Sequence, residues 1–153
     1  MAHKVLQLGK RSADEFCRMR MQLLAELGEM PDGADTFALR DKTKQYFLDH
    51  INKDLFSWGV FQNEELVAVG ALCLFNRLPY RGNLSGAEGY ILNIYTSAQA
   101  RNCGFANEIL DQILVFCRQK GIKRLWLSSS EQGKGIYAKR GFVPIERDMV
   151  LFL

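Results

Sequence analysis

The apolar positions of the first 51 residues recur at helical spacing in two segments. Ser12–Glu15 has the pattern of a capping box, in which the Ser12 hydroxyl covers an early helix amide and the Glu15 carboxylate reaches back. Apolar residues then recur up to Gly28, which predicts the end of this helix: Phe16, Met19, Leu23, Leu24 and Leu27. A second helix is predicted over residues 39–51, after a loop over 29–38 that contains proline and glycine.

The middle of the chain changes to strand-like runs. Residues 56–62 and 66–75 flank Asn63-Glu64, and this spacing predicts a hairpin with a compact turn. The second run is apolar at almost every position, as expected for a strand that is covered on both faces. The remaining predicted elements are, in order, a basic and aromatic loop over 76–86, a strand over 87–96, a helix over 105–120, a strand over 123–129, a short helix over 136–140, and two final strands over 142–146 and 149–153.

This order of elements predicts an α/β or α+β fold with helices packed on a mixed sheet. No internal repeat, low-complexity tract or linker divides the sequence, so we expect one domain over residues 1–153. The composition, with 48% hydrophobic and 24% charged residues, is that of an ordinary globular protein.

Charge and cysteine content narrow the classes of function. The 20 Lys and Arg residues against 17 Asp and Glu leave a net charge of +3, which disfavours a dedicated nucleic-acid-binding protein and suits a small anionic ligand. The longest apolar run is about half the length of a membrane span, and the N-terminal residues lack a signal-peptide pattern, so we expect a cytoplasmic protein with no membrane partner. The four cysteines form no Cys-x-x-Cys pair and there are only two histidines, so no metal site is expected.

Residues Arg101–Ala106 lie between a predicted strand and a predicted long helix. Gly104 can expose its backbone amide without a side chain in the way, and Arg101 adds a positive charge. A helix start has unpaired N–H groups and a positive dipole end, so this segment is a candidate pyrophosphate site. The alternative is that Gly104 only allows the strand to turn into the helix. The segment has neither the Gly-Lys-Ser/Thr of a nucleotide-triphosphate loop nor the three glycines of a dinucleotide fingerprint.

Two blocks of the sequence resemble the GNAT superfamily of N-acetyltransferases. Arg101–Ala106 resembles the superfamily's Gln/Arg-x-x-Gly-x-Gly/Ala motif, and residues 94–100 resemble the strand and bend before it. Downstream, Gly135–Phe142 is similar to its Leu-Tyr-x-x-x-Gly-Phe ending. The resemblance covers about residues 58–153 and is weak over 1–57. It implies an acetyl-CoA-dependent acyltransferase with the GNAT fold, whose central mixed and mostly antiparallel sheet is flanked by helices.

The resemblance also implies the residues of a site. Acetyl-CoA would lie between the strands of Ile94 and Trp126, with main-chain groups of Ile94 and Thr96 along its pantetheine arm. Ser130 takes the position of a superfamily asparagine that contacts the cofactor, and Tyr137 takes that of a tyrosine that protonates the departing thiolate. The residues implied to hold the pyrophosphate are Arg101, Asn102, Cys103, Gly104, Phe105, Ala106 and Asn107.

Glu88 is the candidate for the general base, because some superfamily members keep a base near the start of this strand. It stands six residues before Ile94, so we expect the two side chains to share a face; the alternative is an exposed glutamate. Glu131 and His50 are further candidates, each with a plain surface role as the alternative. Cys103 has no histidine nearby in sequence, so a thiol nucleophile is not expected.

The acceptor is expected to be a primary amine, on a small molecule or a peptide, that attacks the thioester directly once it is deprotonated. Arg77, Tyr80 and Arg81 of the 76–86 loop are candidates for the acceptor side, together with the first two helices. Two other classes stay open: a non-catalytic CoA-binding sensor or interaction module, and a nucleic-acid-binding domain that uses basic residues between 120 and 140. A monomer and a homodimer are both open.

Overall fold

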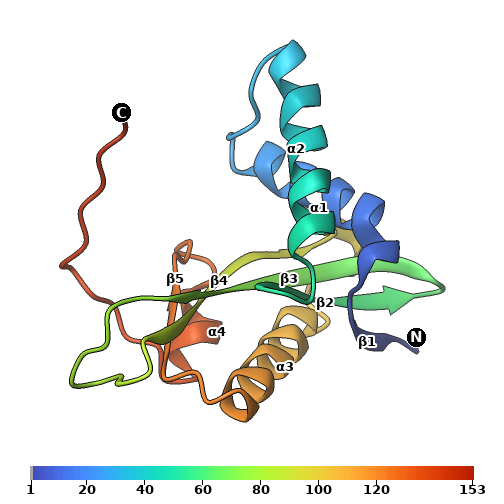
Figure 1. Cartoon of the computed structure of the whole chain (residues 1–153). Helices are drawn as coiled ribbons and strands as arrows, with labels where there is room; N and C mark the ends of the chain where they lie inside the picture. Colours follow the sequence, from blue (N-terminus) through green and yellow to red (C-terminus); the bar gives the residue numbers. More distant parts are fainter. Residues whose placement is uncertain (1) are drawn as a thin grey trace.

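The computed structural model describes residues 2–153, and its strands form one sheet in the order β1-β2-β3-β4-β5, the same order as in the chain (Figure 1). Neighbouring strands pair antiparallel except β4 and β5, which are parallel. The sheet is therefore mixed and mostly antiparallel, and the predicted fold class is confirmed. The strands are β1 (Lys4–Gln7), β2 (Leu55–Gln62), β3 (Glu65–Asn76), β4 (Ala87–Thr96) and β5 (Arg124–Leu127).

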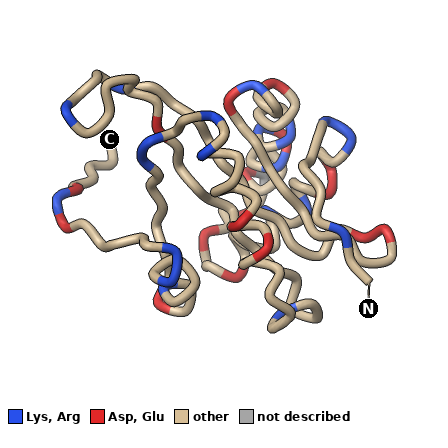
Figure 2. Tube along the Cα trace, turned by 90° about the horizontal axis from the view of Figure 1, so that it is seen from below, with Lys and Arg blue, Asp and Glu red and all other residues tan. Residues whose placement is uncertain are grey.

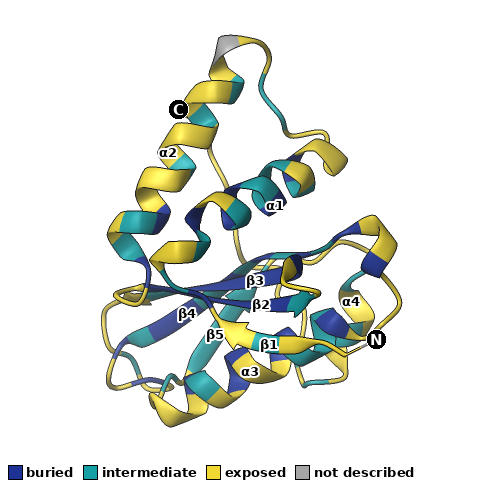
Figure 3. Ribbon diagram, turned by 90° about the vertical axis from the view of Figure 1, so that its right-hand side faces the viewer, coloured by how far each residue is buried: buried dark blue, intermediate teal, exposed yellow. Residues whose placement is uncertain are grey.

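Helices cover both faces of this sheet (Figures 1 and 3). One face carries α1 and α2 and the other carries α3 and α4, and each face has its own apolar core. On the first face Met19 and Phe47 pack on Val69, and on the second Ile109 and Ile113 pack around Leu72. The helices are α1 (Ala13–Glu26), α2 (Ala34–His50), α3 (Phe105–Gln119) and α4 (Lys134–Ala138), with short 3₁₀ turns at Lys10–Ser12 and Ala98–Ala100. No helix within residues 2–153 is both long and apolar enough to cross a membrane.

The hairpin prediction is confirmed, with Asn63 (φ 49°) and Glu64 (φ 67°) in the left-handed turn between β2 and β3. The capping box is wrong. The chain enters α1 through the 3₁₀ turn, whose last residue is Ser12. Ser12 lacks the extended backbone of an N-cap residue (φ −92°, ψ 10°), and its side chain makes no capping bond. The second helix begins at Ala34, five residues before the predicted start, so the loop before it is shorter than expected.

The two ends of the chain also differ from the predictions. β1 was not predicted because it is four residues long and half polar, and only its pairing with β2 defines it. The two final strands, over 142–146 and 149–153, are absent from the described chain. This segment has an apolar pattern that suits a strand, but a strand also needs a ladder partner. Its last residues, from Met149 to Leu153, are at least 78% exposed.

A bulge in β4 changes which side chains face which helices. Val69 pairs with Tyr95 and Ala71 pairs with Leu92, so Asn93 and Ile94 both lie opposite a single residue of β3. Asn93 adopts a left-handed conformation (φ 58°) there. As a result Leu92 packs in the core under α1 and α2, whereas Ile94 packs in the core over α3.

The bulge overturns the expectation that Glu88 and Ile94 share a face. Pairing between β3 and β4 is regular from Ala87 to Leu92, so Glu88 lies on the same face as Leu92. Ile94 lies on the opposite face because the extra residue shifts the alternation by one position.

Candidate active site

The turn before α3 has the geometry of an anion cradle. Asn102 (φ 64°) and Gly104 (φ 80°) both adopt left-handed conformations, and Gly104 directly precedes the first residue of the helix. A Cβ added at Gly104 would meet no atom of the described chain within 4 Å, so the space outside the turn is open. Backbone N–H groups of the first turn of α3 have no acceptor inside the helix. This open turn fits a pyrophosphate group, which needs donors and a positive dipole end.

Arg101 is held on the other side of this turn. Its Nη2 donates to both carboxylate oxygens of Glu26 on α1, at 2.8 and 2.6 Å, and its Nε donates to the carbonyl of Thr96 at 2.9 Å. The guanidinium carbon also lies 5.6 Å from the centre of the Tyr95 ring. Hydrogen bonds from Tyr95 and Arg101 hold the pKa of Glu26 below its usual value. Arg101 therefore ties the loop after β4 to α1, and its charge is largely neutralised by Glu26.

β4 runs past the end of its parallel partner. The last paired residues are Ile91 of β4 and Leu127 of β5, whereas β4 continues to Thr96. The carbonyl of Thr96 is bonded to Arg101, and Ile94 lies within the bulge. Pairing between the two strands therefore ends before β4 reaches the turn that leads into α3. An extended ligand can lie along residues 92–96 where β5 has ended.

Tyr137 lies on α4 and is 91% buried, since only 9% of its surface is exposed. Its ring packs edge-on against Phe142, with centroids 5.9 Å apart, and it lines a groove of about 780 Å³ along β5. Burial raises the pKa of the Tyr137 phenol, which keeps its proton on at neutral pH. The turn before α4 begins at Ser130, whose hydroxyl accepts a hydrogen bond from the Gly133 N–H at 3.1 Å.

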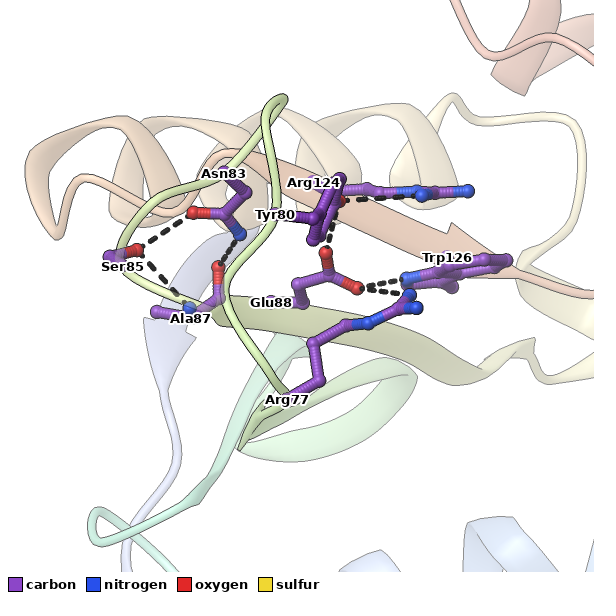
Figure 4. Close-up of polar contacts among 8 residues, drawn as sticks. All are labelled: Arg77, Tyr80, Asn83, Ser85, Ala87, Glu88, Arg124 and Trp126. Atoms are coloured by element: carbon purple, nitrogen blue, oxygen red, sulfur yellow. Dashed lines mark hydrogen bonds and ion pairs between the residues drawn. The ribbon is translucent and has the colours of Figure 1, made fainter.

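Glu88 is fully buried and sits in a cluster of donors (Figure 4). Tyr80 donates to its Oε2 at 2.5 Å, the Trp126 indole N–H donates to Oε1 at 2.7 Å, and Arg77 lies 3.4 Å from Oε1. Arg124 donates to the Tyr80 hydroxyl at 3.3 Å and stacks on Trp126, with its guanidinium carbon 3.9 Å from the ring centre. This cluster joins the start of β4, the 76–86 loop and β5.

The environment of Glu88 favours its ionised form. Burial raises the pKa of the carboxyl, but the hydrogen bonds from Tyr80, Trp126 and Arg77 outweigh this effect and lower the pKa below its usual value. A general base works best when its pKa lies near the working pH, which for a glutamate requires a raised pKa. The pKa of Glu88 is lowered instead, so its environment does not favour the role of a base. Two of the loop residues expected on the acceptor side, Arg77 and Tyr80, point inward to Glu88, while Arg81 is exposed at the loop tip.

The other candidates have local partners. Glu131 pairs with Lys134 at 2.8 Å. His50 pairs with Asp54 at 2.7 Å. Cys103 is exposed, and its thiol lies 3.6 Å from the carbonyl of Arg101.

The structure also brings together residues that sequence reasoning missed. His3 reaches the first turn of α3, where its ring packs on Phe105 at 4.9 Å and its Nε2 lies 2.9 Å from Glu108. Arg20 of α1 donates to the side chain of Asn93 at 3.0 Å. The only sequence signal for Asn93 is that it interrupts an apolar strand, because the partner of each of these residues lies far away in the chain.

A model of the acetyltransferase (GNAT) family matches residues 21–142. The chain belongs to the GNAT family. None of the curated proteins matches it. GNAT proteins use acetyl-CoA, and the chain is an acyltransferase enzyme by its family.

Solved GNAT structures share the whole fold of the chain. A predicted acetyltransferase from Clostridium acetobutylicum, solved with acetyl-CoA, has a TM-score of 0.90 at 23% identity and covers 99% of this chain and 96% of its own. A GCN5-related N-acetyltransferase from Ralstonia eutropha has a TM-score of 0.87 at 21% identity, with 99% of each chain covered. Glucosamine-6-phosphate N-acetyltransferase from Arabidopsis thaliana has a TM-score of 0.73 at 17% identity, again with 99% of each chain covered.

The described part of this GNAT chain contains no group of three or more His, Cys, Asp or Glu residues that could hold a metal ion.

Proposed function

We propose that the chain, as one domain over residues 1–153, transfers the acetyl group of acetyl-CoA to the nitrogen of a primary amine. The observation that carries this proposal is the open turn at Gly104, which lies where β4 outruns β5 and where α3 begins. Family membership supports the use of acetyl-CoA, and the geometry offers a place for both its pyrophosphate and its pantetheine arm.

In this proposal the backbone holds most of the cosubstrate. The amides of residues 102–107 would bind the pyrophosphate, and main-chain groups of Ile94 and Thr96 would lie along the pantetheine arm. Arg101 would contribute mainly by holding the turn in place, since its side chain is bonded to Glu26 and Thr96. Ser130 would approach the cofactor from the turn before α4.

The chemistry requires a neutral amine, because an ammonium has no lone pair for attack. The amine nitrogen bonds to the thioester carbon, the C–S bond breaks, and CoA leaves as a thiolate that takes up a proton. Tyr137 would supply this proton. A free thiol has a pKa of about 8.5 and a phenol about 10, so the transfer between unperturbed groups is uphill by roughly 2 kcal/mol. A water-poor site disfavours the thiolate and reduces this difference.

In this proposal Glu88 holds the 76–86 loop and β5 in place through its bonds to Tyr80 and Trp126, and it does not take the proton of the amine. Proton removal from the amine would then fall to water, or to the amine's own equilibrium with its neutral form.

The direct test is a panel of primary amines with acetyl-CoA, following release of the free CoA thiol. Acetyl transfer to at least one amine, confirmed by the mass of the product, is the expected result. Binding of CoA by calorimetry with no transfer to small amines or peptide N-termini would contradict the proposal and leave the chain as a CoA-binding sensor or interaction module.

We propose that the protein is cytoplasmic. The described chain has four free cysteines, which suit a reducing compartment. Nucleic acid is not proposed as a partner, because the net charge is only +3 and acidic residues are interspersed with the basic ones over the molecule (Figure 2). Tight binding to a DNA duplex that weakens steeply with salt would overturn this exclusion.

A homodimer is part of the proposal. The exposed apolar residues 149–153 are the surface to test first. Light scattering of the whole chain and of a variant that lacks these residues should show a dimer that becomes a monomer. A monomer in both would remove the dimer from the proposal.

A further inference from the structure

A second cavity lies on the face of the sheet that α1 and α2 cover, and its volume is about 330 Å³. The side chains of Phe16, Leu55, Ala71 and Leu92 form an apolar wall from α1 and the strands. The volume is at the lower end of the range of about 300–1,000 Å³ that small-molecule sites occupy. The cavity is therefore large enough for a compact ligand with an apolar body.

Asn93 lines this cavity, and its side chain carries a buried donor that has no partner in the described chain. The residue is 7% exposed, and its Oδ1 accepts a hydrogen bond from Nη1 of Arg20 at 3.0 Å. A guanidinium only donates, so it must face the oxygen of the amide, and this fixes which way the amide points. The Nδ2 group is then buried with no hydrogen-bond partner in the described chain. A buried donor without an acceptor is unfavourable by about 1–3 kcal/mol, so it calls for a ligand oxygen.

The bulge places this donor where it is. In a regular strand Asn93 would point to the α3 face, because side chains alternate. Its left-handed conformation (φ 58°) turns it to the same face as Leu92, and Asn is one of the few residues that adopt this conformation readily. The chain accepts an irregular backbone in the middle of β4, and the result is an amide that lines the cavity.

The charged side chains that line the cavity are all positive. Arg20 and Lys42 line it, and none of the other described residues that line it is acidic. A ligand oxygen that meets Asn93 Nδ2 beside Arg20 is therefore best matched by a carboxylate, which accepts charge-assisted hydrogen bonds from both. Asn93 also directly precedes Ile94, whose main chain is proposed to lie along the pantetheine arm. A ligand that Asn93 binds would therefore lie close to the thioester at the end of that arm.

We propose that this cavity binds the acceptor, and that it selects a compact amine with an apolar body and a carboxylate, such as an apolar amino acid. The role of the ligand as an acceptor rests on the proposed acetyl transfer, but its binding to the cavity can be measured without turnover. Asn93 and Arg20 are the groups that recognise the carboxylate, and the apolar wall recognises the body.

The first experiment compares matched amines. L-phenylalanine and phenethylamine differ by the carboxylate, and L-phenylalanine and glycine differ by the apolar body. We expect L-phenylalanine to have a KM at least about tenfold lower than that of phenethylamine, the factor that one charge-assisted hydrogen bond provides. Its KM should also be at least about tenfold lower than that of glycine, because glycine has no apolar side chain to bury against the wall of the cavity. Calorimetry with each amine and the CoA-loaded protein gives the same comparison without turnover.

The second experiment changes the recognition residue. N93D keeps the size, the left-handed conformation and the bond from Arg20, but it replaces the donor by a carboxylate that repels the ligand. It should raise the KM for L-phenylalanine by about 10- to 100-fold, leave the KM for acetyl-CoA within about twofold, and abolish the preference over phenethylamine. Q22E makes the same amide-to-acid change on an exposed residue of α1 and is the matched control. N93G keeps the backbone conformation and removes the side chain if N93D does not fold.

The outcomes separate this inference from the proposed function. Equal KM values for L-phenylalanine and phenethylamine, or unchanged selectivity in N93D, would overturn the inference and leave acetyl transfer intact. Acetylation of other amines with no binding of apolar amino acids would do the same. Binding of L-phenylalanine that N93D weakens, with no transfer to any amine, would uphold the inference and overturn the proposed function.

Discussion

The two faces of the sheet are built differently. The α3 face is covered by a regular helix, since α3 buries six side chains at helical spacing against the sheet. On the other face only Phe47 is buried among the described side chains of α2, and the sheet beneath carries the bulge at Asn93 and the cavity. In the proposed function the α3 face carries the turn that binds acetyl-CoA, and the opposite face carries the cavity that binds the acceptor. The proposed cosubstrate site is thus built mainly from backbone groups, and the proposed acceptor site from individual side chains.

The largest expected effect lies at the turn on the regular face. G104E should weaken CoA binding by about 100-fold or more, because a carboxylate then occupies the anion site and the charged hydrogen bonds to the pyrophosphate are lost. The side chain has room, since a Cβ there meets nothing within 4 Å. Calorimetry with CoA measures the effect.

G121E is the matched control for this variant. Gly121 ends α3, has a similar φ of 73°, and also has open space around a Cβ, so the backbone strain and the added charge are the same. CoA affinity in G121E should stay near that of the parent chain. An equal loss in both variants would show that strain, not the anion site, is responsible.

The next effect is on turnover. Y137F keeps the ring that packs on Phe142 and removes only the hydroxyl, so CoA affinity should change little while kcat falls by at least about tenfold. Steady-state rates with the best amine of the panel and calorimetry with CoA measure the two quantities. Turnover at the parent rate would make Tyr137 a packing residue.

A third prediction concerns the cluster around Glu88, at the edge of the sheet formed by β5. E88Q removes the ionised acceptor and sets an amide against the donors from Trp126 and Arg77, so the free energy of unfolding should fall by about 1–3 kcal/mol in urea at pH 7. The folded variant should keep most of its turnover. A loss of about 100-fold or more in kcat with normal folding would instead give Glu88 the role of the base.

The pH dependence of stability tests the same cluster. The pKa of Glu88 is lower in the folded chain than its ordinary value of 4.5, so its contribution to stability is fully present above that value and is lost as the pH falls through the folded pKa. Urea unfolding between pH 6 and pH 3 should therefore show a smaller loss of stability in E88Q than in the parent chain. Parallel curves would show that Glu88 does not titrate differently on folding.

The smallest effect is expected at Arg101. Its contact with Glu26 is partly exposed to solvent, and exposed ion pairs contribute about 0–1 kcal/mol. R101A should weaken CoA binding by less than about fivefold, because the backbone amides of the turn remain. E26Q should have a similar small effect if Arg101 acts by holding the turn. A large loss in R101A alone would show that the guanidinium contacts the pyrophosphate directly.

Local patterns in the sequence predicted the parts of the fold that local interactions decide. The β2–β3 hairpin depends on two turn residues, and α3 depends on its own spacing and on Gly121, so both were predicted closely. The turn around Gly104 was found for the same reason. β1 exists only because β2 pairs with it, and the last twelve residues have a strand-like pattern without a partner. Whether a strand finds a partner far away in the chain cannot be predicted from a short stretch of sequence.

The site shows the same limit. Tyr137 and Gly104 stand in recognisable motifs, but the surroundings of Glu88 come from three segments: β4, the loop before it, and β5 with Arg124 and Trp126. Its burial and its lowered pKa follow from those distant donors. The bulge depends on a single residue that shifts the register, and one residue is enough to move every later side chain of the strand to the other face.

The order of the strands has a consequence for how the enzyme assembles. Strands β1 to β4 follow one another in the sheet as they do in the chain, although two helices separate β1 from β2, and the β2–β3–β4 meander can form through short closures. β5 joins in parallel only after the whole of α3 has crossed the sheet, which is a longer and slower closure. The proposed acetyl-CoA site beside the open end of β4 and the Glu88 cluster both lie at this last junction. We therefore expect binding competence to be the final property the folding chain acquires, and acetyl-CoA to slow unfolding by holding the late junction closed.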